Sequence, residues 1–126
     1  MKLYINLIAS FLIASISFAG DIELQNPSTN QKAPDFSGMN TYGEMIRLSN
    51  FIGKPVILEW TNHECPYVAR HYDENNMQTV QKIAQDQEII WLSIISSTPG
   101  DQGHVGPKKA NELTVARGAY PSHVLL

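Results

Sequence analysis

The sequence of 126 residues contains a single cysteine, Cys65, and this scarcity excludes two common classes of small protein. A lone thiol cannot form an internal disulfide, so the chain is not a secreted domain held together by its own disulfides. It also cannot supply the several thiolates of a cysteine-rich zinc site. Any disulfide that Cys65 forms therefore needs a thiol from outside the chain.

Basic residues are also scarce, with 9 Lys plus Arg against 12 Asp plus Glu and a formal net charge of -3. They form no basic stripe of the kind that follows a nucleic-acid backbone, so nucleic acid is not an expected partner. Apolar residues make up 43% of the chain, which excludes disordered and collagen-like proteins. Length and composition together predict one small globular domain. No cofactor is expected.

A long apolar run is present only at the N-terminus, between Leu3 and Phe18. This run is shorter than the roughly 20 residues that cross a bilayer. Ser17 and Ala19 supply the small residues of a signal-peptidase site, so we expect residues 1–19 to be a cleaved signal peptide. An uncleaved anchor is the alternative, and this segment is then the only contact with a membrane. The protein is expected to be exported, with the periplasm as its compartment.

The rest of the chain divides into a polar linker, residues 20–32, and one domain, residues 33–126. Imperfect alternation of apolar residues up to about residue 48 predicts a short hairpin at the start of the domain. The apolar runs 56–60 and 88–96 have the length and β-branched content of strands. Both runs are typical of strands that are buried on two faces, as in a parallel sheet covered by helices.

Helices are predicted between and after these strands. Pro66 suits a first helical position, and residues 66–86 show helical spacing with an interruption at 73–76, where helix propensity is poor. Pro107 opens another helix that closes at Gly118, and a strand-like run follows it. This order of elements predicts a βαβαβ unit with a parallel sheet. The apolar residues that define the first helix are Met77, Val80, Ile83 and Ala84.

Three segments carry a resemblance to a known family: Ala33–Phe36, Leu48–Leu58, and Trp60 followed by the pair Cys65 and Pro66. They resemble the thioredoxin-like redoxins, which include peroxiredoxins of the AhpC/TSA type and thiol-disulfide proteins. The resemblance implies an α/β, thioredoxin-like fold with an N-terminal hairpin and a central, mostly parallel sheet flanked by helices. Because the sequence stops in an apolar strand, we expect a truncated chain in which the last strands and final helix of that fold are missing.

Cys65, directly before Pro66, is expected at a helix N-terminus. The unpaired N–H groups and the positive end of the helix dipole stabilise a thiolate, which is the nucleophile. Such a thiolate attacks a peroxide oxygen to give a sulfenic acid, or a disulfide sulfur to give a mixed disulfide. Thioredoxins carry a second cysteine three residues later, where this chain has Val68. The resemblance therefore implies an external thiol or a thioredoxin-like reductant as partner, and a peroxide or a protein disulfide as substrate.

Several neighbours of Cys65 are candidate supporting residues. His63 can shuttle a proton or can be a solvated loop histidine, and Asn62 can orient a substrate. Similar peroxidatic sites have Thr or Ser at the position of Asn62, whereas Thr61 lies one residue earlier, which disfavours a peroxidase. Glu64 opposes the helix dipole if its carboxylate lies close to the thiol.

More distant candidates have two interpretations each. Glu59, inside an apolar strand, is either a proton relay on the active-site side or the mark of a polar sheet edge. Trp60 either packs in the domain or contacts substrate. The resemblance also implies a cis-proline facing the cysteine, for which Pro121 is the candidate unless that proline belongs to a later strand. Neither Arg70 nor Arg117 is selected as the family's downstream arginine.

Two other functions remain open. A copper-binding thioredoxin-like protein would draw ligands from His63, Cys65, His71 and His104. Cys65 and His71 are, however, six residues apart and do not share a helix face, so no metal site is predicted. A redox-inactive binding module would keep the fold without turnover. The preferred function is that of an oxidoreductase that exchanges disulfides or, as an antioxidant, reduces peroxides.

Overall fold

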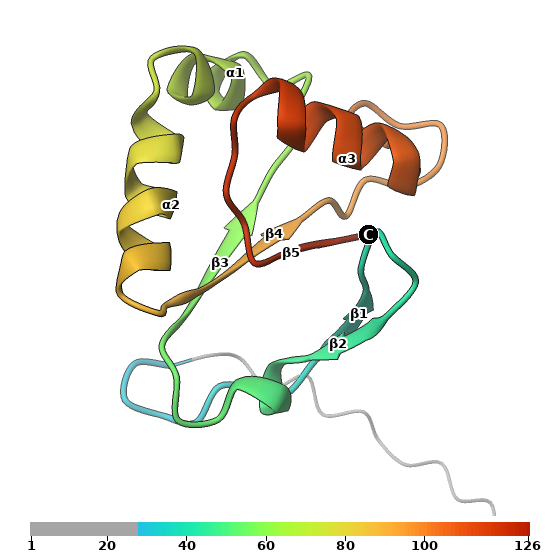
Figure 1. Ribbon diagram of the computed structural model, residues 1–126. Helices are drawn as coiled ribbons and strands as arrows, with labels where there is room; N and C mark the ends of the chain where they lie inside the picture. Colours follow the sequence, from blue (N-terminus) through green and yellow to red (C-terminus); the bar gives the residue numbers. More distant parts are fainter. Residues whose placement is uncertain (1–27) are drawn as a thin grey trace, which may run out of the picture.

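The structure is a computed structural model that describes residues 28–126. The predicted signal peptide, residues 1–19, and the first part of the predicted linker lie outside the described residues. The described residues form a two-stranded sheet, a three-stranded sheet and three α-helices (Figure 1). The predicted α/β class is therefore confirmed. No helix in this part of the chain combines the length and the apolarity needed to cross a membrane.

The predicted hairpin is present as β1 (Ser37–Met39) and β2 (Met45–Arg47), which pair antiparallel. Its turn is organised by Asn40, which is only 2% exposed. The Asn40 side-chain oxygen accepts hydrogen bonds from the backbone N–H groups of Tyr42 and Glu44, both at 2.9 Å. A buried amide that bonds its own turn fixes the conformation of the hairpin turn.

The central sheet has the order β3–β4–β5, and both of its pairings are parallel. β3 spans Val56–Trp60, β4 spans Ile90–Ile94 and β5 spans His123–Leu125. The register sets Glu59 opposite Ser93, so these two side chains share one face of the sheet. All three strands were expected from the sequence.

The helices cover one face of this sheet, and the hairpin lies on the other side (Figure 1). α1 spans Pro66–Asp73, α2 spans Asn76–Asp86 and α3 spans Pro107–Ala116. The predicted interruption separates α1 from α2 at Asn75, whose φ of 62° is left-handed. The predicted close of the last helix is also confirmed, because Gly118 has a φ of 60°.

The buried side of α2 differs from the apolar side that predicted the helix. The structure buries Gln78, Gln81 and Ala84. Val80 and Ile83 stay 45% and 50% exposed. The reason lies in the sheet beneath the helix, which presents polar groups that a glutamine can bond and an isoleucine cannot. Helical spacing predicted the helix correctly, and the sheet beneath it determines which of its residues are buried.

Burial of the strands on two faces is confirmed for β4 and wrong for β3. In β4, Trp91 and Leu92 point to opposite faces and are 6% and 0% exposed. In β3, Leu58 and Trp60 are 37% and 63% exposed. The difference follows from position, because β4 lies between two strands and β3 lies at the sheet edge with one neighbour among the described residues.

Pro121 does not have the predicted cis geometry, since none of the peptide bonds in residues 28–126 is cis. A trans X–Pro bond is favoured by about 0.5–1 kcal/mol unless tertiary contacts enforce the cis form. Here Pro121 belongs to the connection from α3 into β5, where the N–H of Ser122 donates to the Trp91 carbonyl at 2.8 Å. That bond begins the parallel pairing of β5 with β4.

Candidate functional site

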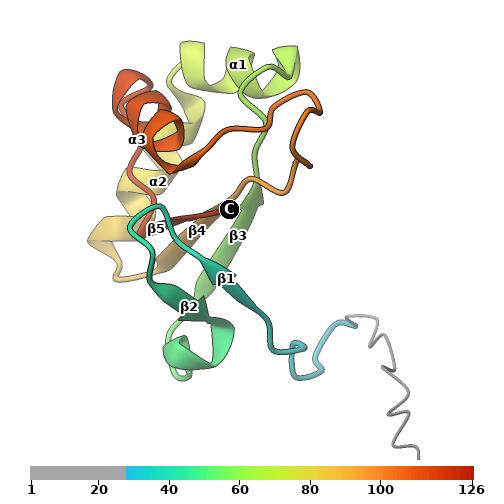
Figure 2. The same ribbon diagram turned by 90° about the vertical axis from the view of Figure 1, so that its right-hand side faces the viewer.

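Cys65 lies where β3 has ended and α1 begins, as the sequence predicted (Figure 2). It is the N-cap residue of α1, with Pro66 at the first helical position. The thiol is free and the residue is half-buried. The Cys65 N–H donates to the Asn62 carbonyl at 3.1 Å, and the Ala69 N–H donates to the Cys65 carbonyl at 2.9 Å. The thiol is thereby placed at the positive end of the helix dipole.

The turn that precedes Cys65 is hydrogen-bonded to the loop of residues 97–106, which lies beside it in Figure 2. The Asn62 side-chain oxygen accepts from the Glu64 N–H at 2.9 Å. The Asn62 amide nitrogen donates to the Gln102 carbonyl at 3.3 Å. The Glu64 carboxylate accepts from the Gly103 N–H at 2.8 Å. Both ends of the Asn62 amide are thus occupied within the protein.

Gly103 is the loop residue that lies directly against this turn. Its φ of 83° is left-handed, and a Cβ at this position would overlap the Asn62 amide. Glycine is therefore required here for two reasons, backbone conformation and space. The sequence offered only a loop glycine at this position.

A second group of polar residues surrounds Glu59, on the face of the sheet covered by helices. We call Glu59, Tyr72, Gln81, Trp91 and Ser93 the Glu59 cluster. The carboxylate accepts hydrogen bonds at 2.8 Å from the Tyr72 hydroxyl, the Trp91 indole and the Ser93 hydroxyl. Gln81 adds a bond at 3.3 Å and is itself fully buried. Glu59, on the edge strand β3, is therefore the acceptor at the centre of a polar network.

The protonation of Tyr72 follows from this network. Burial and the neighbouring Glu59 carboxylate raise the pKa of the Tyr72 phenol well above its ordinary value of 10. The hydrogen bond from Gln81 and the positive charge of Arg117 act in the opposite direction and are weaker. Tyr72 therefore remains a hydrogen-bond donor to Glu59 throughout the neutral range.

Arg117 connects the end of α3 to the turn before Cys65. Its guanidinium donates to the His63 carbonyl at 2.9 Å and lies 4.9 Å from the centre of the Tyr72 ring. Its own carbonyl accepts from the Gln78 amide at 2.6 Å. The charge of Arg117 is thus directed at the backbone of the turn. None of its hydrogen bonds within the described residues reaches Cys65.

A small cavity of about 30 Å³ lies between the turn and the helices, and Thr61, His63 and Arg117 are among its lining residues. The Thr61 hydroxyl and the His63 Nδ1 are buried and have no protein partner in residues 28–126. A space of this size accommodates one water molecule. The His63 side chain is only 21% exposed, with Nε2 4.0 Å from the Glu64 carboxylate. His63 is therefore inserted into the structure, and the interpretation as a solvated loop histidine is wrong.

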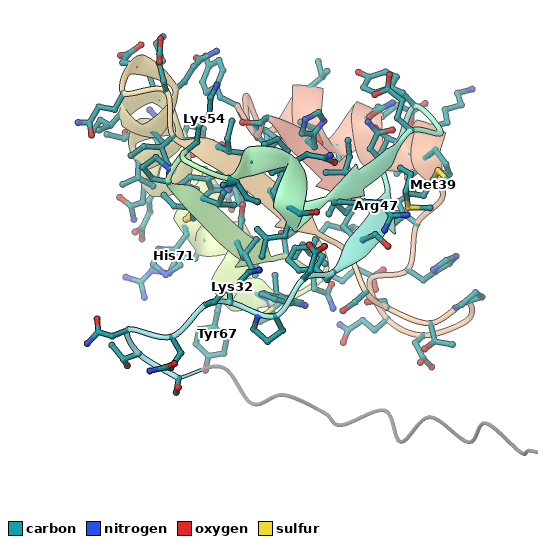
Figure 3. All side chains as sticks on the ribbon, turned by 90° about the horizontal axis from the view of Figure 1, so that it is seen from below. Lys32, Met39, Arg47, Lys54, Tyr67 and His71 are labelled. Carbon is teal, nitrogen blue, oxygen red and sulfur yellow. The ribbon has the colours of Figure 1, made fainter. Side chains whose placement is uncertain are left out.

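Exposed aromatic residues flank the site. Trp60 ends β3 and is 63% exposed, and Tyr67 in the first turn of α1 is 77% exposed. Tyr67 and His71 lie at the periphery of the molecule (Figure 3). Trp60 is thus not a core residue, which rejects packing as its main role.

No group of three or more His, Cys, Asp or Glu side chains comes together within residues 28–126 in a way that could hold a metal ion. His71 is exposed on α1, and the His104 ring lies 3.0 Å from the Ser97 carbonyl. His104 is thus engaged by its own loop, and His71 faces solvent. This arrangement gives no support to a copper site.

The sequence did not identify most of the residues that surround Glu59 and the turn before Cys65. One signal was available, because a carboxylate in an apolar strand needs buried donors and two glutamines follow at helical spacing. Nothing in the sequence identified which tyrosine, serine or tryptophan would supply the other donors. The missed residues are Tyr72, Gln78, Gln81, Trp91, Ser93, Gly103 and Arg117.

The sequence pattern of the AhpC/TSA family matches residues 29–114. The chain belongs to the AhpC/TSA family. The predicted resemblance to thioredoxin-like redoxins is thereby confirmed, and no curated protein matches the sequence of this family member.

Several solved structures have a similar fold. A hypothetical protein from Sinorhizobium meliloti matches 80% of this AhpC/TSA chain with a TM-score of 0.65 and 17% identity. The thioredoxin domain of a thiol-disulfide oxidoreductase from Bacteroides vulgatus matches 80% with a TM-score of 0.58 and 14% identity. A thiol:disulfide interchange protein of the thioredoxin family from Chlorobium tepidum matches 80% with a TM-score of 0.51 and 19% identity. These likenesses show a thioredoxin-like fold.

The AhpC/TSA chain covers less than two thirds of each of these structures. The shares are 54% of the Sinorhizobium meliloti chain, 65% of the Bacteroides vulgatus chain and 63% of the Chlorobium tepidum chain.

Proposed function

We propose that the protein is an exported thiol redox protein in which Cys65 exchanges with disulfides and is regenerated by an external thiol. The supporting observation is a free, half-buried cysteine at the N-cap of α1. The helix dipole favours the thiolate at this position. Membership of a family of redoxins agrees with this role.

The proposed reaction needs no cofactor. The Cys65 thiolate attacks one sulfur of a substrate disulfide, a new S–S bond forms, and the other substrate sulfur leaves as a thiolate. An external thiolate, for example from a thioredoxin-like reductant, then attacks the mixed disulfide and releases Cys65. Over the two steps one substrate sulfur leaves as a thiolate and the other ends in a disulfide with the external thiol. A second thiol of the reductant then displaces that sulfur, so the substrate disulfide is reduced and the reductant's two thiols are oxidised to a disulfide.

Three features favour a disulfide over a peroxide as substrate. Asn62, at the position where peroxidatic sites carry a hydroxyl, has both ends of its amide bonded within the protein. The Thr61 hydroxyl is buried, and the Arg117 guanidinium donates to a backbone carbonyl. The exposed Trp60 and Tyr67 offer aromatic contact surface to a substrate larger than a peroxide. Peroxide reduction remains the second candidate, since the family match favours it.

The test compares the protein with Cys65→Ser after treatment with glutathione disulfide or, separately, with hydrogen peroxide. We expect glutathione disulfide to form an adduct at Cys65 that mass spectrometry detects and that added thiol removes. A sulfenic acid without a mixed disulfide would instead establish the peroxidase. If neither product forms and iodoacetamide alkylates Cys65 only as slowly as an ordinary thiol, the protein is a redox-inactive binding module.

Export is tested on the full chain in its native cell type. Cleavage after Ala19 gives a protein that begins at Gly20 and is recovered outside the cytoplasm. A chain that keeps residues 1–19 and sediments with membranes would indicate the anchored form. Recovery of the uncleaved chain from the cytoplasm would overturn the proposal of export.

A further inference from the structure

We propose that the loop of residues 97–106 restrains the Glu64 carboxylate, and that Glu64 and Gly103 are thereby positioning residues for the Cys65 thiolate. This inference rests on the proposed function, because it concerns the reactivity of the same thiol. It assigns a role to a loop that lies about 40 residues away from the cysteine in the sequence.

The loop and the turn before Cys65 are joined by reciprocal hydrogen bonds. The Glu64 carboxylate accepts from the Gly103 N–H at 2.8 Å, and the Glu64 carbonyl accepts from the Gln102 side chain at 3.5 Å. In the other direction, the Asn62 amide donates to the Gln102 carbonyl at 3.3 Å. The turn is thus held by side-chain and backbone groups of one loop.

The restraint matters because of charge. Glu64 directly precedes Cys65, and a carboxylate close to a thiol disfavours the thiolate. The Glu64 side chain is 50% exposed, so the carboxylate is free to rotate once its bond to Gly103 is lost. In the bonded position, one carboxylate oxygen meets the Gly103 N–H and the other lies 4.0 Å from His63 Nε2.

Other charged groups near the turn are accounted for by their own contacts. Arg117 donates to the His63 carbonyl, and the His104 ring lies against the Ser97 carbonyl. Asp101, in the same loop, is exposed. His63 is therefore the titratable side chain that faces Glu64, with its Nε2 4.0 Å from the carboxylate.

The loop contains a matched control for Gly103. Gly100 and Gly103 have similar left-handed φ angles of 93° and 83°. A Cβ at Gly100 would meet nothing within 4 Å, whereas a Cβ at Gly103 would overlap the Asn62 side chain. Alanine at either position strains the backbone to a similar extent, and only alanine at Gly103 must displace the Asn62 amide that joins the turn to the loop.

The first experiment measures the rate of Cys65 alkylation by iodoacetamide against pH for wild type, Gly103→Ala and Gly100→Ala. The midpoint is the pH at which the alkylation rate reaches half of its maximum. We expect the midpoint for Gly103→Ala to rise by about 0.5 pH unit as the carboxylate is released. The midpoint for Gly100→Ala is expected to match wild type. Equal midpoints for all three proteins, with Gly103→Ala folded by circular dichroism, would overturn the inference.

The second experiment changes the exposed carboxylate itself and does not depend on Gly103→Ala folding. Glu64→Asp keeps the charge on a side chain too short to hold the bond to Gly103, so its midpoint is expected above that of wild type. Glu64→Gln removes the charge, so adding Gly103→Ala to it should no longer raise the midpoint. The same rise with and without the carboxylate would overturn the role of Glu64.

The two proposals fail in different ways. A wild-type Cys65 that alkylates as slowly as a free cysteine and forms no mixed disulfide would overturn the proposed function. A reactive wild-type Cys65 whose midpoint is unchanged in Glu64→Asp and Gly103→Ala would overturn only the role of the loop.

Discussion

A polar cluster and an apolar cluster lie on opposite faces of the central sheet. The face covered by helices carries the Glu59 cluster, in which a carboxylate is surrounded by donors from β4, α1 and α2. The face toward the hairpin is apolar, with Leu92, Ile46 and Leu125 at its centre. The stability of the Glu59 cluster depends on particular hydrogen-bond partners at particular distances. The stability of the apolar cluster depends on how completely its side chains fill the available volume.

Exposure differs between the faces as well. The donors around Glu59 are nearly all withdrawn from water, and Gln81 is fully buried. On the hairpin side, Leu58 and Trp60 remain accessible at the edge of β3. A polar cluster tolerates little loss of a partner, because each unpaired donor keeps its full desolvation cost. An apolar surface is tolerated in water when only part of it is exposed.

Removal of the Glu59 carboxylate should give the largest effect. Glu59→Ala leaves the Tyr72, Trp91 and Ser93 donors without their acceptor, so we expect the free energy of unfolding to fall by about 4 kcal/mol. Urea denaturation followed by fluorescence measures this. Glu59→Gln, which keeps the shape, should lose roughly half as much. A loss below about 1 kcal/mol for Glu59→Ala would mean that water replaces the carboxylate.

Leu92→Ala tests the opposite face. Leu92 is 0% exposed at the centre of the apolar cluster, and its truncation is expected to cost about 3 kcal/mol through lost burial and the cavity left behind. Leu92→Met, which nearly conserves volume, should cost less than about 1.5 kcal/mol. The comparison would fail if Leu92→Met were as damaging as Leu92→Ala, because volume would then not be the determining quantity.

Tyr72→Phe tests the polar face through the pH dependence of the free energy of unfolding. The native state holds the Tyr72 proton more tightly than the unfolded chain, whose phenol titrates near 10. The stabilisation is therefore complete below pH 10 and is lost as pH rises above it, by up to about 1.4 kcal/mol per pH unit. Urea midpoints of wild type and Tyr72→Phe between pH 8 and about 11 measure this. A decline of equal slope in both proteins would assign the pH dependence to other groups.

Trp60→Ala should have the smallest effect on stability. The side chain is 63% exposed, so its removal is expected to change the free energy of unfolding by less than about 1 kcal/mol. The same variant is informative for function, because disulfide exchange at Cys65 should slow if Trp60 contacts the substrate. A loss of several kcal/mol would show instead that the exposed edge of β3 is covered in solution.

Local signals in the sequence were sufficient to predict the helices and strands. Pro66 and Pro107 mark two helix starts, Gly118 marks a helix close, and the runs around Val56 and Ile90 predict strands. Each of these depends on backbone preferences within a few residues, which the sequence displays directly. The position of Cys65 at a helix N-terminus was predictable for the same reason.

Partners across the fold were not predictable in the same way. The sequence left Glu59 between two interpretations and did not select Arg117, although the structure brings Arg117 to the carbonyl of His63. Helical spacing predicted α2, but it did not show that Gln81 would be buried and Val80 exposed. Such choices depend on which face of a distant strand a helix meets.

The sequence by itself determined the family, the order of elements and the one thiol available for chemistry, because motifs and short-range backbone preferences carry that information. The tertiary structure alone decided that Glu59 has four donors, that Gly103 touches Asn62 and that Pro121 is trans. These facts join residues that lie tens of positions apart. Hydrogen bonds and close packing operate over a few ångströms in space, and only the folded chain specifies which residues come within that range.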